Sequence, residues 1–347
     1  MRKSCDRSDC NLDTHNNSRG GTVMSKLKAS VFRPITACLT IVSMVVAARG
    51  AEEIEFHSEP DRVIITAGNQ PIATYVYADQ EISRPYFAHV HVPGAVQVTR
   101  NYPPKVGVDL VDHGTFHPGI WMAFGDIDGQ DFWRNKGRVR HERFIEPPKA
   151  NGSTGFFTVQ NSYCRIEGPD QIVCQETCRY TISIEPTGYL LICDSAFRSP
   201  KEFAFGDQEE MGLGIRLATP ITVKSGGKIT DAFGRVNEKG IWGKSSPWCD
   251  YSGQIHGRKV GILVMSDEAN FRPSRYHVRD YGLLTSNPFG QKVFGDQAAS
   301  RVVVPANETF RLRFGMLLHA NTDQELDRQA AFDRFLSRLK GLPRPTH

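Results

Sequence analysis

The chain has 347 residues, a formal net charge of +4 and a hydrophobic content of 39%. These values are typical of a soluble globular protein with one large domain or two ordinary ones. Because no basic run recurs along the chain, we do not expect nucleic acid as a partner. Glycine, proline and phenylalanine are plentiful and the strand-like apolar runs are short, which favours an all-β fold.

The first fifty residues have the pattern of a leader rather than of a folded domain. Residues 1–23 show no periodic apolar pattern, whereas Met24 begins a basic segment that leads into the apolar run 35–48 and a small-x-small pattern at 48–50. These are the parts of a secretory signal peptide. We therefore expect a leader over 1–50, with Met24 a better start than the first methionine, and a periplasmic or secreted mature protein. The apolar run is too short for a comfortable membrane-spanning helix, so no membrane association is expected after signal removal.

From residue 51 the sequence predicts one strand after another, separated by turn signals. The runs RVIITA and IATYVY flank Gly68-Asn69-Gln70, which is a hairpin signal. The basic run 134–143 predicts a solvated strand edge or the rim of a site, and the glycine-rich stretch 226–251 predicts a loop. The expected strands are Arg62–Ala67, Ile72–Tyr77, Pro85–Val92, Gly119–Phe124, three strands within Phe156–Asp194, Val260–Met265, Arg301–Val304 and Thr309–His319.

The one clear helical pattern comes last. Thr322 and Glu325 have the spacing of a capping box, and the apolar residues that follow recur with helical period up to Leu339. We therefore predict a helix over 322–340. No linker composition occurs inside 51–342, which predicts a single domain with a long β-sheet core and this terminal helix.

Five cysteines follow the leader. A hairpin centred near residue 169 would place Cys164 opposite Cys174, and one centred near 186 would bring Cys178 close to Cys193. Two cross-strand disulfides are consistent with an exported protein. The alternative is that all five cysteines are small buried apolar residues.

The stretch 108–133 concentrates histidine, aspartate and tryptophan in about two strand lengths. His113 and His117 are four residues apart, and His113 follows Asp112. Such a group suits proton transfer or metal binding. The alternative is that these polar side chains satisfy backbone groups of a loop.

Two further segments carry polar residues beside apolar runs. Glu209 and Glu210 precede the run that ends in Arg216, and strand alternation would put the two carboxylates on opposite faces. One of them could be the partner of the histidines; the alternative is a salt bridge to Arg216 or Arg279. The second segment is 276–290. In it His277 and Arg279 share a strand face and Asp280 takes the other, or Arg279 and Asp280 pair to brace the turn at 287–290.

Several motifs in order resemble one bacterial family. They are RPYFAHVHVPGAVQVTRNYPP (84–104), DHGTFHPGIWMAFGDIDGQDFW (112–133), GDQEEMGLGIRLATP (206–220), WCDYSG (248–253) and YHVRDYGLLTSNPFG (276–290). The family is labelled PmoA-like, with a methane-oxygenase name, and is abundant in planctomycetes. Its relatives carry a denser D-H-P-H-H cluster where this chain has Asp112 to His117. The label itself conflicts with the sequence, because after the leader no apolar run reaches about 18 residues.

The resemblance extends to the large antiparallel β-sandwiches of the galactose-mutarotase type, the supersandwich. It implies an exported carbohydrate-active enzyme, an epimerase, lyase or hydrolase that needs no cofactor and acts on a carbohydrate substrate. In this hypothesis His113, His117 and Glu210 are catalytic. Sugar sites combine aromatic faces with carboxylates, arginine and asparagine. The expected substrate-binding residues are Arg100, Asn101, Trp121, Asp126, His277, Arg279, Asp280 and Asn287.

Two alternatives remain open at this stage. The same aromatic surface could belong to a glycan-binding protein without catalysis. The chain could also be a metal-dependent oxygenase, since His89 and His91 alternate onto one face and, with His113 or His117, could hold a divalent metal. The spacing of the carboxylates and histidines does not favour this metal site.

Overall fold

The computed structural model describes residues 52–166, 171–295, 297–321 and 325–342, all within the unit Arg49–His347. The expected leader, its cleavage pattern and the start at Met24 lie outside the described residues.

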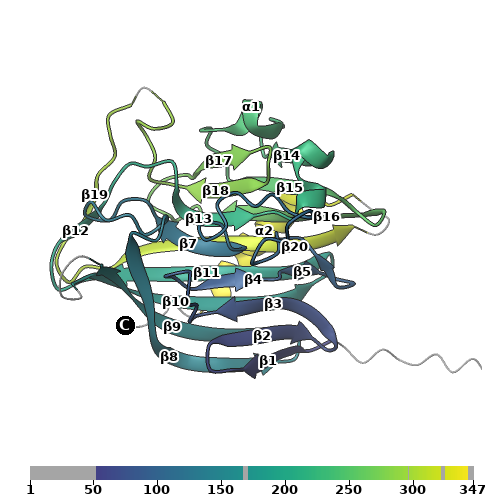
Figure 1. Ribbon diagram of the computed structural model, residues 1–347, viewed down its shortest axis with the longest axis horizontal. Helices are drawn as coiled ribbons and strands as arrows, with labels where there is room; N and C mark the ends of the chain where they lie inside the picture. The colour runs from purple at the N-terminus through teal and green to yellow at the C-terminus, as the bar shows by residue number, and fades with distance from the viewer. Residues whose placement is uncertain (1–51, 167–170, 296, 322–324, 343–347) are drawn as a thin grey trace, which may run out of the picture. The chain divides into compact units, whose positions relative to one another are not determined.

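Two large sheets make up the fold, and every pair of neighbouring strands is antiparallel (Figure 1). The first sheet has the spatial order β1 (Ile54–Ser58), β2 (Arg62–Ala67), β3 (Gln70–Val76), β4 (Tyr86–Ala88), β7 (Ile120–Phe124), β13 (Met211–Arg216), β18 (Leu283–Asn287) and β17 (Arg275–Arg279). The second has the order β14 (Lys228–Asp231), β15 (Trp248–Ile255), β16 (Arg258–Ser266), β20 (Phe310–Asn321), β11 (Gly188–Arg198), β10 (Ile172–Glu185), β9 (Thr154–Arg165) and β8 (Gly137–Asn151). The predicted all-β sandwich is confirmed, and the basic run 134–143 leads into β8, an edge strand as expected.

Short elements complete the described part of the chain. They are the strand pairs β5 (His91–Val92) with β6 (Val96–Gln97) and β12 (Phe203–Phe205) with β19 (Val302–Val304), the 3₁₀ turns Thr219–Ile221 and Val223–Ser225, and the helices α1 (Asn237–Ile241) and α2 (Arg328–Gly341). Among the described residues, no helix is both long and apolar enough to cross a membrane.

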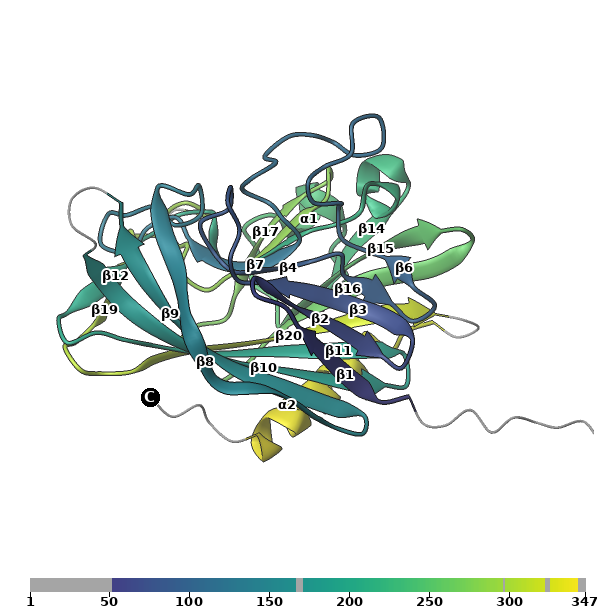
Figure 2. The same ribbon diagram turned by 60° about the horizontal axis from the view of Figure 1, so that its bottom comes forward.

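The period of two along each strand gives the sandwich its core. Val63 and Leu213 of the first sheet and Val159, Leu191 and Val264 of the second belong to one buried apolar cluster. The alternate residues of these strands point to the outer faces. Figure 2 shows the first sheet lying over the second, with loops above its outer face.

The outer face of the second sheet is covered by helix α2. Phe332 and Phe335 pack with Leu190, Ile192 and Leu317 in a second apolar cluster, which explains why β11 is buried on both faces. The helix begins at Arg328, after Asp327, whose side chain accepts a hydrogen bond from the amide of Ala330 at 2.9 Å. The predicted start at 322 is therefore wrong, and Thr322 of the expected capping box lies outside the described residues.

Two other segment predictions are wrong for local reasons. Pro85–Val92 is not one strand, because β4 ends at Ala88 and His89 adopts a φ of 49°. His89 and His91 consequently do not share a strand face. The stretch 226–251 is not a single loop, since it contains β14, α1 and the start of β15.

The expected disulfides are not formed. All five cysteines in the described residues are buried, and none of them forms a disulfide. Cys178 and Cys193 do come together on the β10–β11 hairpin, with their sulfurs 3.4 Å apart. They are diagonal rather than opposite neighbours, because Cys178 faces Ser195 and Cys193 faces Tyr180. At the other hairpin Cys164 faces Ile172 and Cys174 faces Tyr163, beside a register shift.

Candidate active site

The candidate site lies on the outer face of the first sheet, over β7, β13, β18 and β17. The register places Trp121, Gly214, Thr285 and His277 in one row across these four strands. The loop 110–118 crosses above this row and carries the two histidines of the sequence motif. Residues from four separate segments of the sequence thus meet because of strand pairing.

Gly214 forms the floor of the row and cannot carry a side chain. A Cβ at this position would lie 2.5 Å from a ring atom of Trp121 and 2.6 Å from one of Trp133. Both indoles are buried. The absence of a side chain at Gly214 therefore leaves room for both indoles, which meet edge to face with centroids 5.2 Å apart.

Asp112 links the loop to the sheet. Its carboxylate accepts hydrogen bonds from both terminal nitrogens of Arg216, at 2.7 and 3.1 Å, and contacts Nδ1 of His113 at 2.8 Å. Burial acts to raise the pKa of Asp112, but the hydrogen bonds from Arg216 and His113 outweigh it and lower this pKa to about 2. An ionised carboxylate therefore orients the His113 ring through Nδ1. Nε2 of the ring is left to exchange a proton with a ligand.

Arg100 supports the loop from below. Its buried guanidinium donates hydrogen bonds to the carbonyls of Leu110, Asp112, His113 and His117, at distances from 2.6 to 3.3 Å. Four carbonyls of one loop are thus held by a single side chain, so we assign Arg100 to loop support rather than to substrate binding.

Four aromatic rings form a column through the site. Tyr281 and His113 are nearly parallel with centroids 6.4 Å apart, His113 and His117 are 4.9 Å apart, and His117 and Trp121 are 5.2 Å apart. The column runs from the surface to the floor: the His113 side chain is 45% exposed, whereas that of His117 is 1% exposed. His113 also has a φ of 49°, a backbone conformation that carries strain in residues other than glycine and often occurs at functional sites.

His117 and Glu210 lie side by side with opposite pKa shifts. Nε2 of His117 is 3.8 Å from a Glu210 oxygen and 3.4 Å from the indole nitrogen of Trp133. Burial and the positive charge of Arg216 lower the pKa of His117 well below its ordinary value. Burial raises the pKa of Glu210, although the ion-paired guanidinium of Arg134 acts against this rise.

The neighbouring Glu209 joins the cluster to β17. Its carboxylate lies 3.3 Å from Nδ1 of His277 and 3.6 Å from Arg279, and Arg279 also pairs with Glu238 at 2.9 Å. The hydrogen bond from His277 lowers the pKa of Glu209. The expectation that only one of the two glutamates reaches the site is wrong, because both precede β13 and strand alternation does not apply there.

The structure brings together most of the expected site residues, but with changed roles. His113, His117, Glu210, His277 and Arg279 belong to one connected group. Trp121 is the buried floor of the ring column rather than an exposed platform.

Four other expected substrate contacts hold the backbone or a loop. Asn287 is fully buried, donates to the carbonyls of Gln208 and Glu209, and accepts from two amides of its turn. The other three residues also bind the protein itself. Asn101 donates to Asp109, Asp126 accepts from the amide of Gly129, and Asp280 accepts from the amide of Glu238.

Some members of the site were not predicted for it. Arg216 and Arg134 hold the two key carboxylates, and Glu238 fixes Arg279. The sequence signal available for Arg216 was its position at the end of a predicted strand, in a chain that also carries a histidine motif. Glu238 had none, because its helix α1 lies in the stretch predicted as a loop.

The histidines do not form a metal-binding group. Among the described residues, no three His, Cys, Asp or Glu side chains are placed so that they could hold a metal ion. His113 and His117 stack face to face, which directs their nitrogens sideways rather than toward a common point.

Several solved structures resemble the chain at low sequence identity. An α-galactosidase from Geobacillus stearothermophilus is 11% identical, with 82% of this chain and 43% of that chain covered and a TM-score of 0.42. An α-galactosidase from Lactobacillus brevis is 9% identical, with 78% and 40% covered and a TM-score of 0.36. A galactose mutarotase related enzyme from Lactobacillus acidophilus is 10% identical, with 79% and 100% covered and a TM-score of 0.35. The chain thus spans about two fifths of the two α-galactosidases.

No curated protein matches the sequence. A family model described as a family of unknown function, DUF6807, matches residues 62–333, which include the whole candidate site and every strand of the two large sheets except β1. The chain therefore belongs to the DUF6807 family of unknown function.

Proposed function

We propose that the protein is a carbohydrate-active enzyme that transfers protons at a sugar, with His113 and Glu210 as its catalytic residues. The observation that carries this proposal is the Asp112–His113 pair above the His117–Glu210 contact. It provides an oriented, partly exposed imidazole and a nearby carboxyl of raised pKa within one cluster.

The two catalytic groups take complementary roles. The Glu210 carboxylate removes the proton of the anomeric hydroxyl while Nε2 of protonated His113 donates a proton to the ring oxygen, so that the ring C–O bond breaks as the carbonyl forms. With a glycoside, Glu210 instead removes a proton from water, which replaces the bridging oxygen that His113 protonates. A carboxyl whose pKa is raised by burial is a stronger base than one in water. Asp112 stabilises the protonated imidazole and keeps Nδ1 as a donor.

The residues around this pair serve the substrate and the geometry. Glu209, Arg279 and Tyr281 are partly exposed next to it, so they supply hydrogen bonds to hydroxyl groups and one aromatic face. His117 is a positioning residue, because it is buried between His113 and Trp121 and can reach Glu210 but not a ligand.

The test is turnover of a panel of free sugars, glycosides and uronate polymers by the full chain, followed by NMR of the products. We expect one class to be converted, with loss of turnover in His113→Ala and in Glu210→Gln. Binding of glycans without conversion of any member would overturn the enzyme in favour of a glycan-binding protein. Unchanged turnover in both variants would remove these residues from the mechanism.

A further inference from the structure

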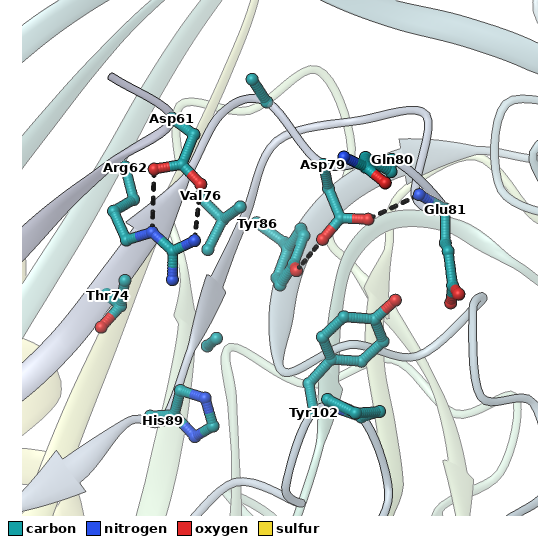
Figure 3. A pocket seen from close by; sticks show the side chains of 13 residues that line it. Asp61, Arg62, Thr74, Val76, Asp79, Gln80, Glu81, Tyr86, His89 and Tyr102 are labelled. Atoms are coloured by element: carbon teal, nitrogen blue, oxygen red, sulfur yellow. Dashed lines mark hydrogen bonds and ion pairs between the residues drawn. The ribbon is translucent and has the colours of Figure 1, made fainter. Parts of the chain in front are cut away.

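A large pocket lies on the same outer face, over β2, β3 and β4, and no part of the mechanism above uses it. Its volume is about 700 Å³, within the range of small-molecule sites. We call it the tyrosine pocket; its lining includes Arg62, Thr74, Glu81, Tyr86, His89 and Tyr102. Figure 3 shows these side chains surrounding one open space.

Two hydrogen-bonded pairs hold the walls of the tyrosine pocket. Asp61 accepts from Nε and Nη2 of Arg62 at 2.9 and 2.5 Å, which leaves Nη1 of Arg62 without a partner among the described residues. Asp79 accepts from the hydroxyl of Tyr86 and from the amide of Glu81, both at 2.8 Å. In Figure 3 the two pairs stand apart, with His89 and Tyr102 below them. The walls are therefore fixed before any ligand binds.

The lining has the chemistry of a site for hydroxyl groups. Tyr102 is partly exposed and presents aromatic surface, and its ring meets the buried ring of Tyr86 edge to face at 5.4 Å. Nη1 of Arg62 and the exposed carboxylate of Glu81 offer a donor and an acceptor. Once Asp61 neutralises Arg62, the remaining charges are those of Asp79 and Glu81. An anionic ligand would be repelled, and a flat apolar ligand would leave these polar groups unpaired.

The pocket adjoins the candidate active site. β4 pairs with β7 and β7 pairs with β13 in a register that puts Tyr86 of the pocket level with Trp121 and Gly214 of the site floor. Tyr86 and Gly214 are therefore two strand spacings, about 10 Å, apart. One apolar cluster lies beneath both: it contains Tyr86 and Trp121, with Tyr102 and Tyr281 packed against it.

We propose that the tyrosine pocket binds an uncharged sugar unit of the substrate whose neighbouring unit reacts at His113. The inference rests on the proposed function and extends it: the substrate is a neutral oligosaccharide or glycan rather than a single sugar or an acidic polymer.

The test is isothermal titration of the full chain with lactose, cellobiose and maltose as neutral probes and digalacturonate as the anionic one. We expect at least one neutral disaccharide to bind and digalacturonate not to bind. Arg62→Ala and Glu81→Ala should each weaken that binding about tenfold. Arg338→Ala is the matched control, because Arg338 is also a partly exposed arginine paired with a carboxylate, that of Glu185 on the far sheet.

The outcomes separate this inference from the proposed function. Binding that depends on Arg62 and Glu81 but survives in His113→Ala supports the pocket, even if no sugar is turned over. If turnover depends on His113 but its KM and kcat are unchanged in Arg62→Ala and Glu81→Ala, the proposed sugar binding in the tyrosine pocket is wrong. The proposed enzymatic function then still stands. Absence of neutral binding, or equal affinity for digalacturonate, also overturns the pocket.

Discussion

Arg216 holds Asp112 with both of its terminal nitrogens, across 104 positions of sequence. The guanidinium is buried at the end of β13, whereas the side chain of Asp112 on the loop is 36% exposed. This ion pair is a direct link between the sheet and the segment that carries His113. Its loss would leave Arg100 to hold the loop and would leave a buried cation without its carboxylate partner.

Because Arg216 is buried but Asp112 is more than one third exposed, we expect Asp112→Ala to lower the free energy of unfolding by about 2 kcal/mol, between the cost of breaking an exposed pair and that of breaking a buried one. The cost comes from the unpaired Arg216, so Asp112→Ala combined with Arg216→Met should be more stable than Asp112→Ala alone. Urea denaturation of the two variants measures this. As a control, Glu142→Ala, which breaks a partly exposed pair with Arg140, should cost less than about 1 kcal/mol.

The same pair should make stability depend on pH in acid. The pKa of Asp112 is about 2 in the folded chain, below its ordinary value of 3.8. A lowered carboxyl pKa contributes stability that is present above the ordinary value and is lost as the pH falls toward 2. In Asp112→Asn this part of the dependence should vanish. An identical acid profile in wild type and variant would show that the ion pair does not form.

His113 and His117 should respond differently to truncation. His113 is partly exposed and donates the proton in the proposed mechanism, so His113→Ala should lower kcat about a hundredfold or more with little change in stability. His117 is buried in the ring column, so His117→Ala should lower the free energy of unfolding by about 2 kcal/mol or more while the activity that remains keeps its pH profile. His57→Ala, at an exposed histidine of β1, is the control for both measurements.

The acid limb of the pH–activity profile should depend on Arg134. Burial raises the pKa of Glu210 and the charge of Arg134 opposes the rise. In the proposed mechanism Glu210 acts as a carboxylate, so activity should fall as the pH drops through its pKa. Arg134→Ala removes the opposing charge, which raises this pKa further and moves the limb to higher pH. A limb that stays in place would show that another group controls it.

A buried carboxyl in the core should lower stability at neutral pH. Glu176 is 2% exposed between the sheets, where it accepts hydrogen bonds from Ser195 at 2.6 Å and Asn161 at 3.0 Å. Burial raises its pKa. A raised carboxyl pKa means that the folded chain binds the proton more tightly, so stability falls as the pH rises from the unfolded pKa to the folded one.

Glu176→Gln should therefore be more stable than wild type at pH 8 and should lose this pH dependence. The new amide can donate to the buried oxygen of Asn161, which lacks a partner among the described residues. Thermal melts at pH 5 and pH 8 measure the difference. Glu146→Gln, on the edge strand β8, should not reproduce this change, because its carboxylate is 41% exposed. A less stable Glu176→Gln at pH 8 would contradict the assignment.

The fold could be predicted because its signals are local. Alternating apolar runs located most long strands, and β2 was predicted with its observed bounds. The errors fell where backbone geometry decides: His89 has a positive φ, and Asp327 rather than Thr322 lies at the start of α2. Neither is visible in the periodicity of the side chains.

The sequence predicted which residues belong to the site better than it predicted what each of them does. The motifs placed His113, Glu210 and Arg279 in one group, but arginine and asparagine look the same in sequence whether they bind a ligand or a loop. Arg100 and Asn287 were expected at the substrate and instead hold carbonyls. Only the three-dimensional path of the loop distinguishes the two uses.

Gly214 gives the first sheet a local sensitivity that a search for reactive groups would overlook. Even alanine at this position would collide with both indoles and tilt the stacked rings upward, displacing the imidazole at their exposed end. Selection on the reaction would therefore act strongly on a residue that has no chemistry of its own. A mutational scan that ranks positions by loss of activity should therefore rank Gly214 close to His113 and Glu210.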